Sequence, residues 1–187
     1  MKNNRSNRIL AAALIVLVAI FVLVAVMVSK ATYNRKVAEE KLTDVDFYSM
    51  QSFCGENAEA VMAALKSGNK DKLAALLPGA SGIEDVMEFA DWSKADFKNA
   101  ESLGAGSLTA APDESGRMDV SERFFVEAGD KKYVLFIETL TSRWGRKNEG
   151  VTAVGVTTYK HFDDTGFAWN GEKDDSSALA GELWWNK

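Results

Sequence analysis

The sequence predicts an α+β protein in which an N-terminal transmembrane helix precedes helices packed on a curved antiparallel sheet of four to five strands. Three observations support this prediction. An unbroken apolar run lies near the N-terminus, segments with helical periodicity follow it, and runs with strand periodicity separated by turns fill the second half. Helices and antiparallel strands that are segregated along the chain are typical of the α+β class.

The apolar run from Ile9 to Val28 contains no polar residue over 20 positions. A helix of that length spans roughly 30 Å, the thickness of the hydrocarbon core of a bilayer. A signal peptide has an apolar region of only about 7–15 residues. A cleaved export signal is the alternative, because small residues flank Lys30. The length of the run and this lysine favour an uncleaved anchor over residues 9–29, which contacts the membrane through residues 9–28.

The orientation of this anchor rests on the basic residues beside it. They are equal in number on the two sides, with Lys2, Arg5 and Arg8 before the run and Lys30, Arg35 and Lys36 after it. Long domains cross membranes largely regardless of such charges. We expect a cytoplasmic head (1–8), a stalk helix (30–42) and an extracytoplasmic domain (43–187) in the cell membrane.

The charge of the chain restricts its partners. All 27 acidic residues follow the anchor, and four of the 22 basic residues lie at or before its end, which leaves a net charge of −9 beyond it. An acidic domain is a poor nucleic-acid binder and is repelled by anionic headgroups. We therefore expect no nucleic-acid partner, although solubility alone is the simpler use of this charge.

Cysteine and histidine each occur once, at Cys54 and His161. An intrachain disulfide and a thiolate or imidazole zinc cluster are thereby excluded. Cys54 falls on an apolar stripe and is expected to be a buried, inert thiol rather than an interchain bridge. His161 could pair with Asp163, but a strand-end histidine beside an acidic turn at Asp163-Asp164 is the simpler interpretation. This turn lacks calcium-loop spacing, so neither a metal nor a cofactor is expected.

Helical signals begin at Thr43 or Asp44, either of which is a possible N-cap. Beyond them, apolar or small residues recur with i, i+3, i+4 spacing, interrupted only by Asn57, and Gly68 and Asn69 end the segment. A short second helix follows and is stopped by Pro78. A third begins in "SGIEDVMEFADW". The residues of the stripe are Phe47, Met50, Phe53, Cys54, Ala58, Val61, Met62 and Leu65.

From about Lys98 the periodicity approaches two, and turn signals recur at short intervals. Turns this short favour antiparallel pairing of successive strands. The stripe from Met50 to Leu65 is expected to cover one face of the resulting sheet. The expected strands are 117–127, 132–144 and 151–162, with weaker ones at 99–110 and 178–185.

A long amphipathic helix, a short helix with the cadence of "SGNKDKLAALLPG" and then an antiparallel sheet resemble the nuclear-transport-factor-2-like, or cystatin-like, superfamily. The resemblance covers residues 43–185 and implies a cone-like domain; "LGAGSLTAAPDESG" departs from the pattern. The superfamily includes isomerases, dehydratases, binding proteins and membrane-anchored partners of secretion and transport machines. Its isomerases use an acidic base inside the cone. Asp119, Tyr133 and Glu138 lie on expected strands, but nothing marks them as inward, so no catalytic residue is assigned.

Two groups of residues are candidates for binding a ligand or a partner. Arg143, Arg146 and Lys147 surround Trp144 in an expected hairpin loop and form the one basic cluster of an acidic domain. An exposed charged hairpin tip is the simpler interpretation. The second group comprises Trp169, Trp184 and Trp185, which could line a pocket or form an apolar patch. Closing the core is their simpler use.

These features predict a single-pass membrane protein whose domain binds an envelope partner or assists assembly. One alternative is a small-molecule binder that uses the cone pocket. A less favoured one is an isomerase or dehydratase, which requires a buried carboxylate with a raised pKa facing that pocket.

Overall fold

The computed structural model describes residues 42–108, 116–165 and 176–182. Residues 44–187 group into one compact unit, distinct from residues 1–43. No helix within the described ranges is both long enough and apolar enough to cross a bilayer. The apolar run from Ile9 to Val28 lies outside them, as does the stalk predicted for residues 30–42 apart from its last residue.

The helical half begins with α2, which runs from Phe47 to Lys66. Asp46, rather than Thr43 or Asp44, is its N-cap, and one carboxylate oxygen of Asp46 accepts from the Ser49 N–H at 3.0 Å. Shorter elements follow: α3 (Lys70–Leu76), α4 (Ile83–Glu88) and two 3₁₀ turns, η1 (Trp92–Lys94) and η2 (Phe97–Asn99).

The second half forms an antiparallel sheet with the strand order β1-β2-β3-β4-β5, so each strand pairs with its neighbour in sequence. This confirms the predicted meander, which has five strands within the described residues. Register shifts interrupt the β1–β2 and β3–β4 ladders, where bulges increase the local twist. The strands are β1 (Glu101–Leu108), β2 (Met118–Ala128), β3 (Lys131–Ser142), β4 (Lys147–Thr158) and β5 (Ser177–Gly181).

One prediction about the strands is wrong. β4 ends at Thr158, and the helix α5 (Tyr159–Thr165) replaces the expected strand end and turn. The Thr158 hydroxyl accepts from the His161 N–H at 3.3 Å, the contact of an N-cap. His161, Asp163 and Asp164 therefore lie on a helix.

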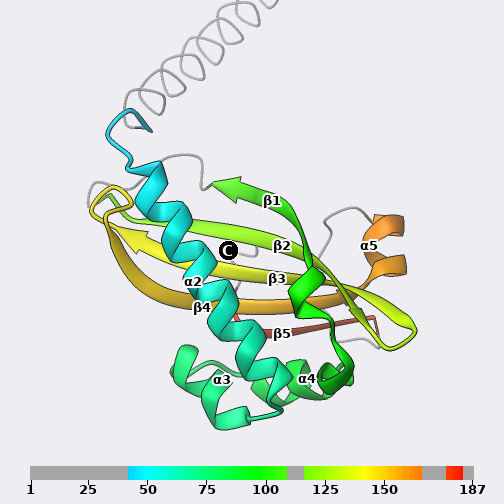
Figure 1. Cartoon of the computed structure of the whole chain (residues 1–187). Coiled ribbons are helices and arrows are strands. Elements are labelled where there is room, and N and C mark those ends of the chain that lie inside the picture. The colour runs from blue at the N-terminus through cyan, green and yellow to red at the C-terminus, as the bar shows by residue number, and fades with distance from the viewer. Residues whose placement is uncertain (1–41, 109–115, 166–175, 183–187) are drawn as a thin grey trace, which may run out of the picture. The chain divides into compact units, whose positions relative to one another are not determined.

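The core lies between α2 and the sheet. Figure 1 shows α2 crossing the strands, and its Val61 and Leu65 are fully buried together with Leu135 and Val154. The predicted stripe is confirmed from Met50 to Leu65. Phe47, at its start, is 46% exposed and does not join the core.

The two faces of β2 have different environments. Phe124 and Val126 pack in the core under α2, whereas Phe125 makes edge contacts with Tyr159 and Phe162 of α5. Since side chains alternate along a strand, even-numbered residues of β2 face α2 and odd-numbered ones face α5. In β3 the assignment is reversed, because Leu135 and Ile137 belong to the core and Phe136 contacts Phe162.

Candidate functional site

The β3–β4 hairpin loop holds the predicted basic cluster. Three successive residues adopt left-handed backbone conformations: Arg143 (φ 52°), Trp144 (φ 61°) and Gly145 (φ 79°). The half-buried Trp144 donates its N–H to the Gly116 carbonyl oxygen at 3.1 Å, and its own carbonyl oxygen accepts from the Asp46 N–H at 2.8 Å. The loop thus joins the start of β2 to the start of α2.

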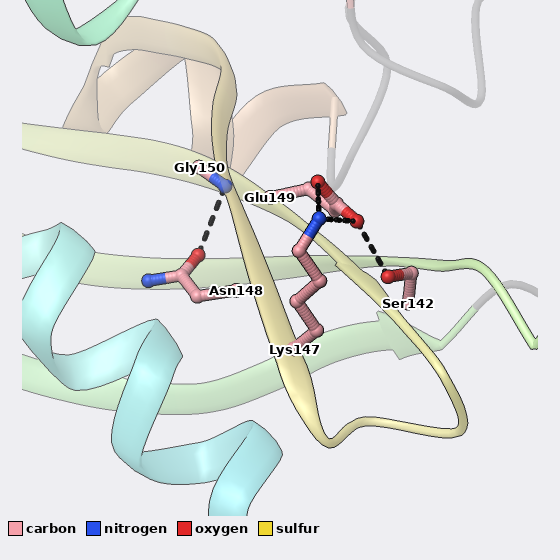
Figure 2. A network of polar contacts seen from close by, with 5 residues as sticks. All are labelled: Ser142, Lys147, Asn148, Glu149 and Gly150. Carbon is pink, nitrogen blue, oxygen red and sulfur yellow. Dashed lines mark hydrogen bonds and ion pairs between the residues drawn. The ribbon is translucent and has the colours of Figure 1, made fainter.

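The basic side chains of this loop have different surroundings. Lys147 Nζ lies between the two carboxylate oxygens of Glu149, at 2.9 and 3.0 Å, and the Ser142 hydroxyl donates to the same carboxylate at 2.5 Å (Figure 2). Arg146 donates to the Asp44 carbonyl oxygen at 3.3 Å. Arg143 is exposed, and the described part of the chain gives it no ion pair. The cluster is therefore three separate groups rather than one basic site.

A pair of side-chain amides, the buried Asn57 and the half-buried Asn148, connects α2 to the sheet just inside this hairpin. Asn57 Nδ2 donates to the Asn148 side-chain oxygen at 3.0 Å, and Asn148 Nδ2 donates back to Asn57 at 3.1 Å. Asn57 also donates to the Thr139 hydroxyl at 3.2 Å. The Asn148 oxygen accepts from the Gly150 N–H as well, at 2.9 Å (Figure 2). Asn57, the one break in the apolar stripe, is thus satisfied within the fold.

Cys54 and Glu122 lie beside this amide pair. Burial raises the pKa of the Cys54 thiol to about 12, and the nearby Glu122 carboxylate adds to the increase. Burial also raises the pKa of Glu122, which is an even-numbered residue of β2 and so faces α2. Glu122 is a candidate that the sequence did not single out, although its two-residue spacing from Val120 and Phe124 places it on the same face of the strand. Cys54 is buried, as predicted.

The three possible acid–base residues named from the sequence do not lie together beside Glu122. They are Asp119, Tyr133 and Glu138. Tyr133 is buried in the core, with ring centroids 5.9 Å from those of both Phe89 and Trp92. Glu138 is fully buried but faces α5, and Asp119, at an odd position of β2, also faces that side. The carboxylates of Asp119 and Glu138 therefore lie on the opposite face of the sheet from that of Glu122.

The histidine also has a structural contact. His161 Nδ1 lies 3.1 Å from the Ser176 hydroxyl, while Asp163 and Asp164 are exposed on α5. Within the described residues, no group of three or more His, Cys, Asp or Glu side chains is arranged to hold a metal ion.

A hollow of about 360 Å³ opens on the α5 side of the sheet, at the corner where β1 begins and β2 ends. Carboxylates and aromatic rings line most of it. Its floor includes Phe125, whose ring centroid lies 5.3 Å from that of Tyr159. The lining residues are Asp96, Asn99, Glu101, Phe125, Val126, Glu127, Lys132 and Tyr159.

The tryptophans are distributed between the core, the hairpin and undescribed segments. Trp92 is a core residue, and its ring N–H donates to the Val86 carbonyl oxygen at 2.8 Å. Trp144 is half-buried in the hairpin. Trp169, Trp184 and Trp185 lie outside the described residues.

Comparison of the chain with protein-family models finds no matching family, and comparisons with curated proteins and with solved structures give no match.

Proposed function

We propose that this chain is a single-pass membrane protein whose extracytoplasmic, cone-like domain binds an envelope protein partner through the β3–β4 hairpin. The 20 apolar residues from Ile9 to Val28 support the anchor, since their length matches a bilayer core. The helix-on-sheet arrangement of residues 47–181 is compatible with the superfamily resemblance.

The observation that carries the partner site is the backbone at Arg143. A non-glycine residue in the left-handed region costs about 1 kcal/mol or more, and such strain concentrates at functional sites. The exposed Arg143 side chain makes no ion pair within the described residues, so packing gives no reason for a side chain there. Contact between the Arg143 guanidinium and an anionic group of a partner would explain why a residue other than glycine occupies this strained position.

The position of the hairpin also suits this role. Trp144 fastens the loop to Asp46, the N-cap of α2, which follows the predicted stalk closely in sequence. A rigid loop loses little conformational entropy on binding, which favours affinity. The hairpin would therefore present Arg143 in a fixed geometry near the tethered end of the domain.

A photocrosslinking residue introduced at position 143 of the full-length chain in its native membrane tests this proposal. We expect one discrete adduct at position 143 and none from position 75, an exposed site on α3. With the crosslinking residue at position 146 instead, Arg143→Ala should lower the yield of the adduct with the same partner several-fold relative to the chain that keeps Arg143. Equal adducts from positions 143 and 75, or no effect of the substitution, would refute the hairpin as the partner site.

Small-molecule binding between α2 and the sheet is a second candidate function, and Glu122 favours it. Desolvation raises the pKa of this half-buried carboxylate, which lies beside Cys54, and a carboxylate of this kind is also what isomerase or dehydratase chemistry needs. Compounds that raise the melting temperature of the wild-type chain but not of Glu122→Gln would support this function. Compounds that stabilise both proteins equally would place the ligand elsewhere.

A further inference from the structure

We infer that the hollow at the β1–β2 corner is a binding site for an organic cation, either a substituted ammonium or a guanidinium group. The site lies on the α5 side of the sheet and is separate from the hairpin and from Glu122. Its chemistry is independent of the proposed function. Three properties support it: a concave space, an excess of carboxylates over lysines in its lining, and exposed aromatic surface.

The size of the hollow suits a small ligand or a single inserted side chain. Its volume is about 360 Å³, at the lower end of the roughly 300–1,000 Å³ typical of ligand pockets. Backbone contacts fix its walls. The Asp96 N–H donates to the Glu127 carbonyl oxygen at 2.8 Å, and Ala95 bridges to Ala128. The hollow is therefore part of the folded sheet edge.

The charges in the hollow favour a cation. Of its three carboxylates, only Glu127 has a lysine partner, Lys132, at 2.9 Å. Glu101 has no basic partner among the described contacts, and Asp96 makes no ion pair there, although the nearby charge of Lys66, which lies outside the lining, acts on it. The lining therefore holds three carboxylates and one lysine. The Asn99 side chain and backbone N–H donate to Asp96 and lower its pKa, so this carboxylate stays ionised at neutral pH. An anionic ligand would be repelled.

The aromatic residues favour an organic cation over a bare metal ion. Phe125 is half-buried, and Tyr159 is 39% exposed, one of the large apolar side chains that the fold leaves open to solvent. Aromatic faces attract ammonium and guanidinium groups and also contact their carbon atoms. A hydrated divalent ion would instead need several converging oxygen ligands. The combination of rings and carboxylates therefore matches a cation that has an apolar part.

Two sources could supply such a group: a free small molecule, or a lysine or arginine side chain of a protein. Both sources carry the same kind of cation. The relative affinities of a free compound and of a peptide that carries the same group distinguish them. A free ammonium compound contacts only the hollow, whereas a peptide also contacts its rim. A blocked Gly-Arg-Gly peptide that binds more tightly than ethylguanidine identifies a protein side chain as the ligand. Equal affinities identify a free small molecule.

Fluorine NMR of the full-length chain in detergent micelles, labelled with fluorotyrosine, tests the inference. The chain has only four tyrosines, so the Tyr159 signal can be assigned with Tyr159→Phe. The probe is tetramethylammonium, and its neutral isostere tert-butanol is the control. We expect tetramethylammonium to shift the Tyr159 signal in a saturable manner, with the Tyr133 signal in the core unchanged. A saturable shift with tert-butanol as well would overturn the inference.

Substitutions distinguish a local site from the overall negative charge. Asp96→Asn combined with Glu101→Gln should weaken tetramethylammonium binding about 10-fold, as expected for two exposed charge contacts. Glu88→Gln with Asp85→Asn removes the same charge from α4 and should change the affinity by less than twofold. Equal losses in the two double variants, or no saturation in the wild-type chain, would show that the hollow is not a cation site. An unchanged Tyr133 signal verifies that each variant is folded.

Discussion

The Asp46 main-chain N–H donates to the Trp144 carbonyl oxygen at 2.8 Å, which fixes the first turn of α2 to the β3–β4 hairpin. The two residues are far apart in sequence: Asp46 is the N-cap of α2, and Trp144 lies in the loop between β3 and β4. This contact explains why α2 starts at Phe47, several residues later than the sequence signals at Thr43 and Asp44 suggested. It also makes the hairpin a structural part of the fold as well as a candidate binding surface.

The approach of the hairpin to α2 predicts that Gly145 cannot be replaced. A Cβ at Gly145 would lie 2.9 Å from the Asp46 carbonyl oxygen and 3.3 Å from Met50 Cβ. Gly79 has nearly the same φ, 81° against 79°, but open space around it. We expect Gly79→Ala to lower the free energy of unfolding by about 1 kcal/mol and Gly145→Ala to lower it by about 2–3 kcal/mol. Urea unfolding of both variants measures the difference, and equal losses would contradict the close contact.

The strained backbone at Arg143 predicts a gain in stability on replacement by glycine. Arg143→Gly should raise the free energy of unfolding by about 0.5 kcal/mol, because glycine tolerates a φ of 52° without a Cβ clash. Arg143→Ala keeps the Cβ and removes the guanidinium, so its stability should stay within about 0.5 kcal/mol of the wild type. Urea unfolding measures both variants, and we expect Arg143→Gly to have the higher free energy of unfolding. A reversed order would mean that the left-handed conformation is not strained.

The half-buried position of Glu122 predicts a specific dependence of stability on pH. Its pKa is raised in the folded state, so its contribution to stability is fully present below the ordinary value of 4.5 and is lost as the pH rises through the folded pKa. Glu122→Gln should therefore stabilise the domain at pH 7, with less effect at pH 4. Glu59→Gln removes the same charge from the exposed side of α2 and controls for net charge. An equal effect of the two substitutions at pH 7 would contradict the desolvation of the Glu122 carboxylate.

The raised pKa of Cys54 predicts an unreactive thiol. A pKa of about 12 instead of 9.0 reduces the thiolate fraction at pH 8 by about 1,000-fold, and burial blocks access as well. A thiol reagent should label the native chain slowly and the urea-unfolded chain at an ordinary rate. In a Cys54→Ala background, Ser52→Cys places a thiol on the exposed face of the same helix and should react rapidly without urea. Rapid labelling of native Cys54 would contradict the predicted packing of α2.

The sequence allowed the α2 stripe and the meander to be predicted because both depend on local periodicity. Residues from Met50 to Leu65 follow the helical repeat, and turn signals separate the strands. The helix α5 was missed because Thr157, Thr158 and Tyr159 favour strands and continue the pattern of β4. Only the N-cap contact from Thr158 to His161 ends that strand, and threonine is common in both settings.

The site residues were harder to predict because their roles depend on contacts distant in sequence. The basic cluster appeared continuous, yet Lys147 pairs with Glu149 while Arg146 donates to Asp44. No local pattern indicates which charges will be paired. The hollow likewise combines residues from η2, three strands or their ends, and α5, so its lining emerges only from the tertiary fold.

Protease accessibility in cells shows on which side of the membrane the C-terminal domain lies. Intact cells and spheroplasts would be treated with protease, and the chain would be followed by mass and by an antibody to its C-terminus. We predict that the full-length mass persists before treatment and that the domain is digested in spheroplasts without lysis of the inner membrane. Protection until that membrane is lysed would place the domain in the cytoplasm and contradict the proposal of an extracytoplasmic partner module.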